Sequence, residues 1–248
     1  MCLLDCGGQI GAVTPEHASS FFFLDADLNV SREVKCPEMM FVRKMWPLGN
    51  DRFLAFHFPF ATGALLSIVD GRGTVLERFY PASAPKGISL REYFIDNFYM
   101  ADYRAGKIYL AKVYPEDELL EVEIIDLKTR TIRSMTAAID GFSGQKANFK
   151  KSSAVSLGKA AIAAVNGVFA ANDGGVYVSL SVNNLARRGQ SFKHYLYRFD
   201  DRGAFSKKTE VPFGCVLYYE RDKETFVSQK DISDEAADQT EFVLFSVK

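Results

Sequence analysis

The sequence of 248 residues predicts an all-β fold built from repeated antiparallel sheets of four strands. One observation is a β-hairpin pattern around Asp70, in which a β-branched run enters a glycine-containing turn and a second run leaves it. The same pattern recurs around Asp25, Asp126 and Asp200. The other observation is that further strand-like runs precede the hairpins, so each hairpin is expected to complete a sheet.

The spacing of the repeats favours a β-propeller of four-stranded antiparallel blades. Successive hairpin aspartates are 45, 56 and 74 residues apart. Repeats of about 40–50 residues with four short strands are typical of propeller blades, and the longer intervals indicate loop insertions. One such sheet buries too little apolar surface alone, so blades are expected to stack face to face. The chain holds about four to five blades, which predicts an open arc of a larger propeller.

The chain is expected to form a single domain. Its predicted parts are a partial blade at 1–37, blades at 38–82, 83–140 and 141–212, and a three-stranded partial blade at 213–248. Turns between strands are rich in Gly, Pro, Asn and Asp, as at residues 47–51 and 172–175. Middle strands such as 108–111 are apolar on both faces, and the small residues of 160–164 suit an innermost strand.

Two stretches leave an alternative open. Residues 88–99 and 152–164 have leucine and aromatic spacing, or alanine content, that also fits a helix. Periodicity alone does not separate the two for short apolar runs. The strand interpretation, which includes an innermost strand at 94–99, is preferred for both.

The outer hairpins resemble those of the six-bladed bacterial propellers of the NHL and TolB-like kind. The resemblance rests on residues 68–73 and 197–203, each preceded by a strand pair, and it extends over most of the chain from Ser19 onward. It implies the fold and little about function, since such propellers include binding scaffolds, lipoproteins and hydrolases. Against six blades, this chain is expected to be incomplete at its N-terminus. A backbone ladder from residues 241–247 to the first 35 residues would instead indicate a closed ring.

The outer turns carry a specific local prediction. Asp70 and Asp200 are each followed three residues later by Gly73 and Gly203. An aspartate can bond the turn backbone, and glycine accepts a positive φ without a Cβ clash. We therefore expect both aspartates to cap their turns and both glycines to adopt positive φ.

Composition narrows the classes of partner. Thirty Lys and Arg nearly cancel 31 Asp and Glu, which leaves a net charge of −1 and no field for nucleic acid. No apolar run approaches the ~20 residues of a membrane span, so no membrane insertion is expected and the chain is expected to be soluble, with any export signal lying upstream of Met1. The four cysteines are too few and scattered for a disulfide framework.

No catalytic motif is present, and no catalytic or metal-ligating residue is assigned. Of the three histidines, His57 lies in a strand and is expected to be a satisfied structural residue, whereas His17 and His194 are expected to be solvated. A catalytic triad is therefore not expected. The acidic runs at 116–118 and 231–235 lack the spacing of a calcium loop and are expected to be solvated.

The weak binding candidates are residues expected near a channel mouth. Asp96 and Asn97 fall on the expected innermost strand, where the resemblance to lactonase-type propellers implies calcium ligands. Trp46 and Arg43, three residues before it, fall on another innermost strand. The alternatives are that Trp46 is a packing residue over the core and that Arg43 lies at a solvated strand end.

Two functions follow from these residues. The first is a non-enzymatic binding or scaffold propeller, without a cofactor, that presents loops at one face and the central channel to a protein or small-molecule ligand. The second is a calcium-assisted hydrolase or lactonase with its ion in the channel. The scarcity of histidine and the missing metal motifs favour the first.

Overall fold

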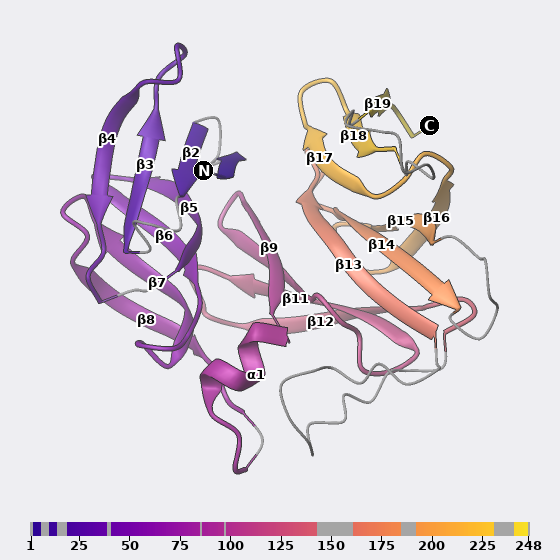
Figure 1. Ribbon diagram of the computed structural model, residues 1–248, viewed down its shortest axis with the longest axis horizontal. Helices are drawn as coiled ribbons and strands as arrows, with labels where there is room; N and C mark the ends of the chain where they lie inside the picture. Colours follow the sequence, from indigo (N-terminus) through magenta and orange to yellow (C-terminus); the bar gives the residue numbers. More distant parts are fainter. Residues whose placement is uncertain are drawn as a thin grey trace, which may run out of the picture. The chain divides into compact units, whose positions relative to one another are not determined.

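The computed structural model describes residues 2–5, 10–13, 19–38, 41–84, 86–96, 98–142, 161–184, 192–230 and 241–247. Within them it has five antiparallel sheets and one short helix, which confirms the predicted all-β class with four-stranded blades (Figure 1). The chain divides into two compact units, Met1–Asp96 and Asn97–Lys248. No helix in the described part is long and apolar enough to cross a membrane.

The first unit contains two blades whose strands follow one another in chain order. The first blade is formed by β1 (Cys2–Asp5), β2 (Ile10–Val13), β3 (Ser20–Leu24) and β4 (Val30–Lys35). The second is formed by β5 (Val42–Gly49), β6 (Arg52–His57), β7 (Ala64–Asp70) and β8 (Val75–Pro81). The partial blade predicted for 1–37 is therefore wrong, because β1 and β2 extend its hairpin to four strands.

The first unit ends in helix α1 (Leu90–Asp96), where the preferred prediction was a strand. The helical alternative holds because Leu90, Tyr93 and Phe94 recur at the three-to-four-residue spacing of a helix face, and Phe94 is buried. The following strand begins only at Tyr99.

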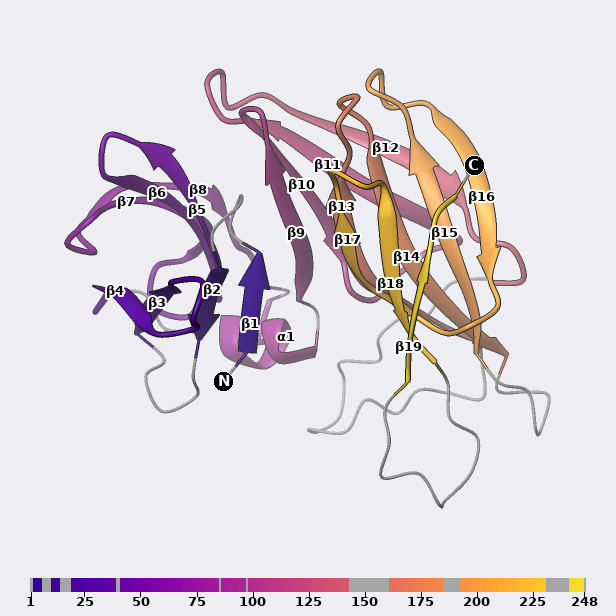
Figure 2. The ribbon, with the colours of Figure 1, turned by 90° about the horizontal axis from the view of Figure 1, so that it is seen from above.

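The second unit contains three blades (Figure 2). The third blade is formed by β9 (Tyr99–Arg104), β10 (Lys107–Lys112), β11 (Leu119–Asp126) and β12 (Ile132–Ala138). The fourth is formed by β13 (Ala161–Ala170), β14 (Val176–Asn184), β15 (Lys193–Phe199) and β16 (Phe205–Val211). The fifth is formed by β17 (Val216–Glu220), β18 (Thr225–Gln229) and β19 (Phe242–Phe245). The first strand β13 contacts both β9 and β17, so the first strands form the inner edges of their blades. Within the described residues the last sheet has the three strands β17, β18 and β19. Residues 161–164 are a strand, and 152–160 lie outside the described residues.

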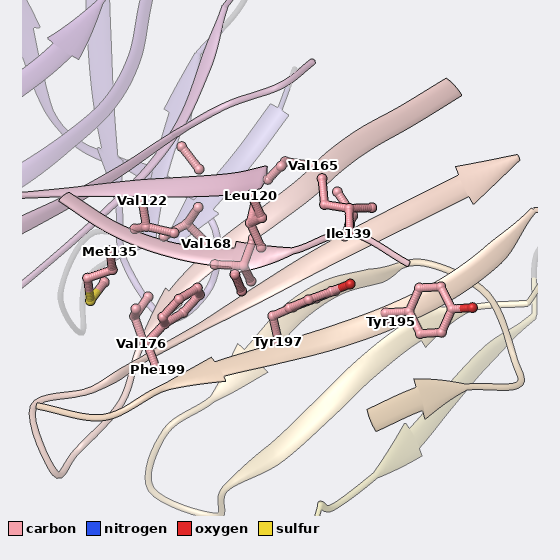
Figure 3. Close-up of a cluster of buried hydrophobic side chains, with 14 of the residues drawn as sticks. Leu120, Val122, Met135, Ile139, Val165, Val168, Val176, Tyr195, Tyr197 and Phe199 are labelled. Carbon is pink, nitrogen blue, oxygen red and sulfur yellow. The ribbon is translucent and has the colours of Figure 1, made fainter. Parts of the chain in front are cut away.

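The main core lies between the β9–β12 and β13–β16 sheets (Figure 3). Leu120 and Val122 of β11 face Tyr197 and Phe199 of β15 across it, all less than 2% exposed. Every second residue of a strand points to the same face, so the alternate residues of β11 point away from this core. The core thereby fixes which residues of β11 are presented on the opposite face of its sheet.

The aspartates of the outer turns cap them as predicted. Oδ1 of Asp70 accepts hydrogen bonds from the amides of Arg72 and Thr74, both at 2.9 Å, and Gly73 has a φ of 83°. The turn of Asp200 is built in the same way, and the φ of Gly203 is 89°. Amide bonds to the carboxylate also lower the pKa of Asp70.

An arginine on the outer strand of one blade holds the turn of the next blade. Arg32 lies seven residues after Asp25 and donates to the carbonyl of Gly71 at 3.0 Å. Arg133 lies seven residues after Asp126 and donates to the carbonyls of residues 201 and 202. This Asp-x6-Arg spacing recurs in the sequence and links neighbouring outer hairpins within each unit.

Candidate functional site

Two buried serine–histidine pairs each join neighbouring strands of a blade. His57 Nε2 lies 2.8 Å from Ser67 Oγ, and both side chains are fully buried. Its Nδ1 lies 2.9 Å from the carbonyl of Phe58, so Nδ1 carries the proton and Nε2 accepts the hydroxyl of Ser67. A backbone carbonyl thus occupies the place of a triad carboxylate, and the predicted structural role of His57 is confirmed.

The environment of His57 keeps the ring neutral. Burial lowers its pKa to about 4, against a raising contribution from the Phe58 carbonyl and a smaller lowering from the charge of Arg78. A hydroxyl that no substrate can reach cannot act as a nucleophile. This pair therefore joins β6 to β7 and offers no reactive group at the surface.

The second pair corrects the expectation for His194. Its Nδ1 lies 2.6 Å from Ser181 Oγ, which also accepts a hydrogen bond from Asn166 Nδ2 at 2.6 Å. His194 is 7% exposed rather than solvated, because β15 pairs it directly with Ser181 of β14. His17 lies outside the described residues.

The other predicted site residues do not come together at a surface. Trp46 is 1% exposed in β5, opposite Leu54, which fits the packing alternative. Arg43 is exposed, with its guanidinium 5.8 Å from the ring centroid of Phe58. Asp96 belongs to the helix α1 instead of an innermost strand, and Asn97 lies outside the described residues.

The buried cysteine has no reactive character. Burial, and secondarily the charge of Asp70, raises the pKa of Cys36 to about 12, so the thiol stays protonated. Cys215 is half-buried.

An open groove lies on the β9–β12 sheet, on the face opposite the core. Its volume is about 310 Å³, and its floor includes Leu110 of β10 and Glu121 and Glu123 of β11. The register places Glu123 opposite Leu110 and Glu121 opposite Thr136, so alternation along β11 directs both glutamates to this side. We call this hollow the acidic groove; its other lining residues are Tyr99, Lys112, Pro115, Glu116, Asp117, Leu119, Leu120 and Thr136.

The acidic groove carries four carboxylates against one ammonium group. Lys112 Nζ lies 2.8 Å from Glu116 Oε1, a partly exposed pair whose two residues both line the groove. The sequence predicts solvated charges at residues 116–118, and the two glutamates of β11 are not among the predicted site residues. Their alternation in the run Leu119–Asp126 was the available signal. Within the described ranges no three His, Cys, Asp or Glu side chains are grouped to hold a metal ion.

A buried ion pair fixes the sheet that bears the acidic groove. Asp102 of β9 is 3% exposed, and its Oδ2 lies 2.5 Å from the guanidinium of Arg221 and 2.8 Å from the amide of Ala170. Arg221 also donates to the carbonyl of Ala170 at 3.1 Å. One carboxylate therefore joins the inner ends of three blades. No sequence motif indicates this ion pair, because the two charged residues are 119 positions apart and share no local pattern.

No described protein family and no curated protein matches this sequence. Among solved structures, a member of the DUF4221 family from Bacteroides vulgatus superposes with a TM-score of 0.59 at 10% identity, covering 96% of this chain and 76% of that one. This likeness shows the fold. The chain is a β-propeller.

Two further structures are more distant. A protein of unknown function from Bacteroides caccae has a TM-score of 0.43 at 12% identity, covering 83% of this chain and 61% of that one. A luciferin-regenerating enzyme has a TM-score of 0.37 at 9% identity, with 93% and 83% covered. The described residues form five blades, and the expected six-bladed NHL or TolB-like class is not established by these likenesses.

Proposed function

We propose that this protein is a non-enzymatic binding propeller whose ligand is cationic and occupies the acidic groove. The observation that carries the proposal is the excess of carboxylates in an open hollow on a rigid sheet. Glu121 and Glu123 project from β11, whose other face is locked in the main core. Such a site is pre-organised, which reduces the ordering cost of binding.

The size and lining of the groove define the ligand class. A volume of about 310 Å³ is at the small end of ligand sites and fits one or two amino-acid side chains. Leu119, which is 45% exposed, offers apolar contact to a methylene chain, and the carboxylates attract its charged end. An ammonium or guanidinium group on an aliphatic stem, as in a lysine- or arginine-containing peptide, satisfies both features.

The outer turns of the blades also bear on the kind of propeller to which this chain is related. We infer that they are related to the six-bladed bacterial propellers, on the strength of the shared Asp-x-x-Gly turns at Asp70 and Asp200. The calcium-assisted hydrolase is the less favoured function, since Asp96, one of its two candidate ligands, lies in a helix instead of on an innermost strand.

A peptide titration tests the proposal. Fluorescence anisotropy of labelled hexalysine and hexaglutamate peptides should show binding of hexalysine alone, weakened by raising the salt concentration. The variant Glu121→Gln/Glu123→Gln should weaken this binding about tenfold or more. Glu210→Gln, which removes an exposed carboxylate from β16, should leave it unchanged. Equal binding of both peptides, or equal binding by the groove variant, would contradict the proposal.

A further inference from the structure

A second hollow lies between the third and fourth blades, at the end where their outer turns lie. Its volume is about 430 Å³, and three cationic side chains line it: Lys107 at the start of β10, Arg133 of β12 and Arg202 of the turn between β15 and β16. Its acidic lining residues are Asp126 and Asp201, so cations exceed carboxylates by three to two. We call this site the basic hollow.

The strand pairing directs two of the cations to this place. Lys107 is paired with Asp126, and Arg133 is paired with Ile124, so the two members of each pair share one face of the sheet. Ile124 and Asp126 are two residues apart on β11 and therefore face the same side, and Ile124 is buried in the main core. Lys107 and Arg133 thus lie at the rim of that core, beside the turn that carries Arg202.

The protein groups around the basic hollow do not neutralise its cations. Oδ1 of Asp126 accepts hydrogen bonds from the amides of Lys128 and Thr129, at 2.9 and 2.8 Å. Arg133 donates from Nη1 and Nη2 to two carbonyls of the neighbouring turn, which leaves three of its five N–H groups for another acceptor. In the described part of the chain, none of the three cations lies within ion-pair distance of a carboxylate oxygen.

The first unit has the same arrangement with its charge compensated. Arg32 corresponds to Arg133 in the Asp-x6-Arg spacing, and it likewise donates to a carbonyl of the next outer turn. Its guanidinium also lies 2.6 Å from Oδ1 of Asp51, in the turn between β5 and β6. In the second unit the turn between β13 and β14 carries Asp173, and Arg198 holds this carboxylate. Among the described residues, Arg133 therefore has carbonyl partners and no counterion.

We propose that the basic hollow binds a phosphate group, either free phosphate or the end of a small phosphomonoester. Ionised phosphate oxygens accept hydrogen bonds, and Lys107, Arg133 and Arg202 offer only donors. The three cations come from different segments, so they can reach several oxygens of a tetrahedral group, whereas one guanidinium satisfies a planar carboxylate.

The size of the basic hollow leaves room for more than the phosphate group. A volume of about 430 Å³ lies within the range of small-ligand sites, so an organic group can follow the phosphate. This inference is independent of the acidic groove, which lies on the opposite face of the β9–β12 sheet.

Isothermal titration calorimetry of the full chain in phosphate-free buffer at low salt tests the proposal. Glycerol 3-phosphate should bind, glycerol should not, and added salt should weaken the binding. Inorganic phosphate is the second arm and separates the two sources. Weaker binding of inorganic phosphate than of the ester shows that the organic group contributes, and equal or tighter binding identifies free phosphate as the ligand.

A pair of charge-matched variants places the binding in the basic hollow. Lys107→Gln/Arg202→Gln should weaken phosphate binding about tenfold or more, because it removes two of the three cations. Neither side chain has a hydrogen bond or ion pair in the described part of the chain, so the fold should be retained, which circular dichroism checks. Lys193→Gln/Lys230→Gln is the control, since it removes the same charge from exposed residues outside the hollow and should leave binding unchanged.

Three results would overturn the proposal. They are the failure of both phosphate compounds to bind, binding that Lys107→Gln/Arg202→Gln leaves unchanged, and an equal loss of binding in the control variant.

Discussion

Acidification should selectively weaken the blade that contains His57. The ring is fully buried between Ser67 and the Phe58 carbonyl, and its pKa is lowered from 6.5 to about 4. Below pH 6.5 the unfolded chain binds a proton that the folded chain excludes, so stability falls as pH falls until the folded pKa is reached. The difference between the two pKa values corresponds to about 3 kcal/mol, lost between pH 6.5 and 4.

Urea unfolding followed by Trp46 fluorescence measures this loss. Trp46 is the one tryptophan of the chain and lies on β5, which pairs with the strand that carries His57. The comparison is with His57→Leu/Ser67→Ala, which removes both partners and leaves no buried donor unsatisfied. Carboxylates contribute equally to both proteins, so their difference isolates His57. Parallel stability curves of the two proteins from pH 7 to 4 would refute the reasoning.

Three further substitutions test the packing of the blades. Gly73→Ala should destabilise the first unit by about 3 kcal/mol or more in the same urea assay, because the new Cβ would lie 1.6 Å from the Lys35 carbonyl oxygen. Gly63 also has a positive φ, of 68°, but has open space around it, so the control Gly63→Ala should cost only about 1 kcal/mol. Asp102→Ala should lower the free energy of unfolding by about 3–5 kcal/mol, measured by thermal unfolding, because it leaves the charge of Arg221 buried without its carboxylate. The control Lys230→Gln removes an exposed ion pair with Glu241 and should lower it by less than about 1 kcal/mol. Leu28→Gly should stabilise by about 1 kcal/mol because Leu28 is exposed and has a φ of 62°, and a loss of stability there would contradict the strain argument.

Part of the acidic groove can be predicted from the sequence. The alternation of Glu121 and Glu123 with Leu120 and Val122 shows which side chains share a face. It does not show what lies beside them: Lys112, Glu116 and Thr136 join the groove only through the pairing of β10, β11 and β12.

The sequence by itself determined the repeating strands and their turns. These depend on alternation of apolar residues and on Asp and Gly at fixed spacings, which act within one hairpin. The tertiary structure decided the helix at Leu90–Asp96, the burial of His194 and the pairing of Asp102 with Arg221. Each of these depends on which distant residue covers a side chain. The free energy gained by burying that side chain arises only when the blades pack together.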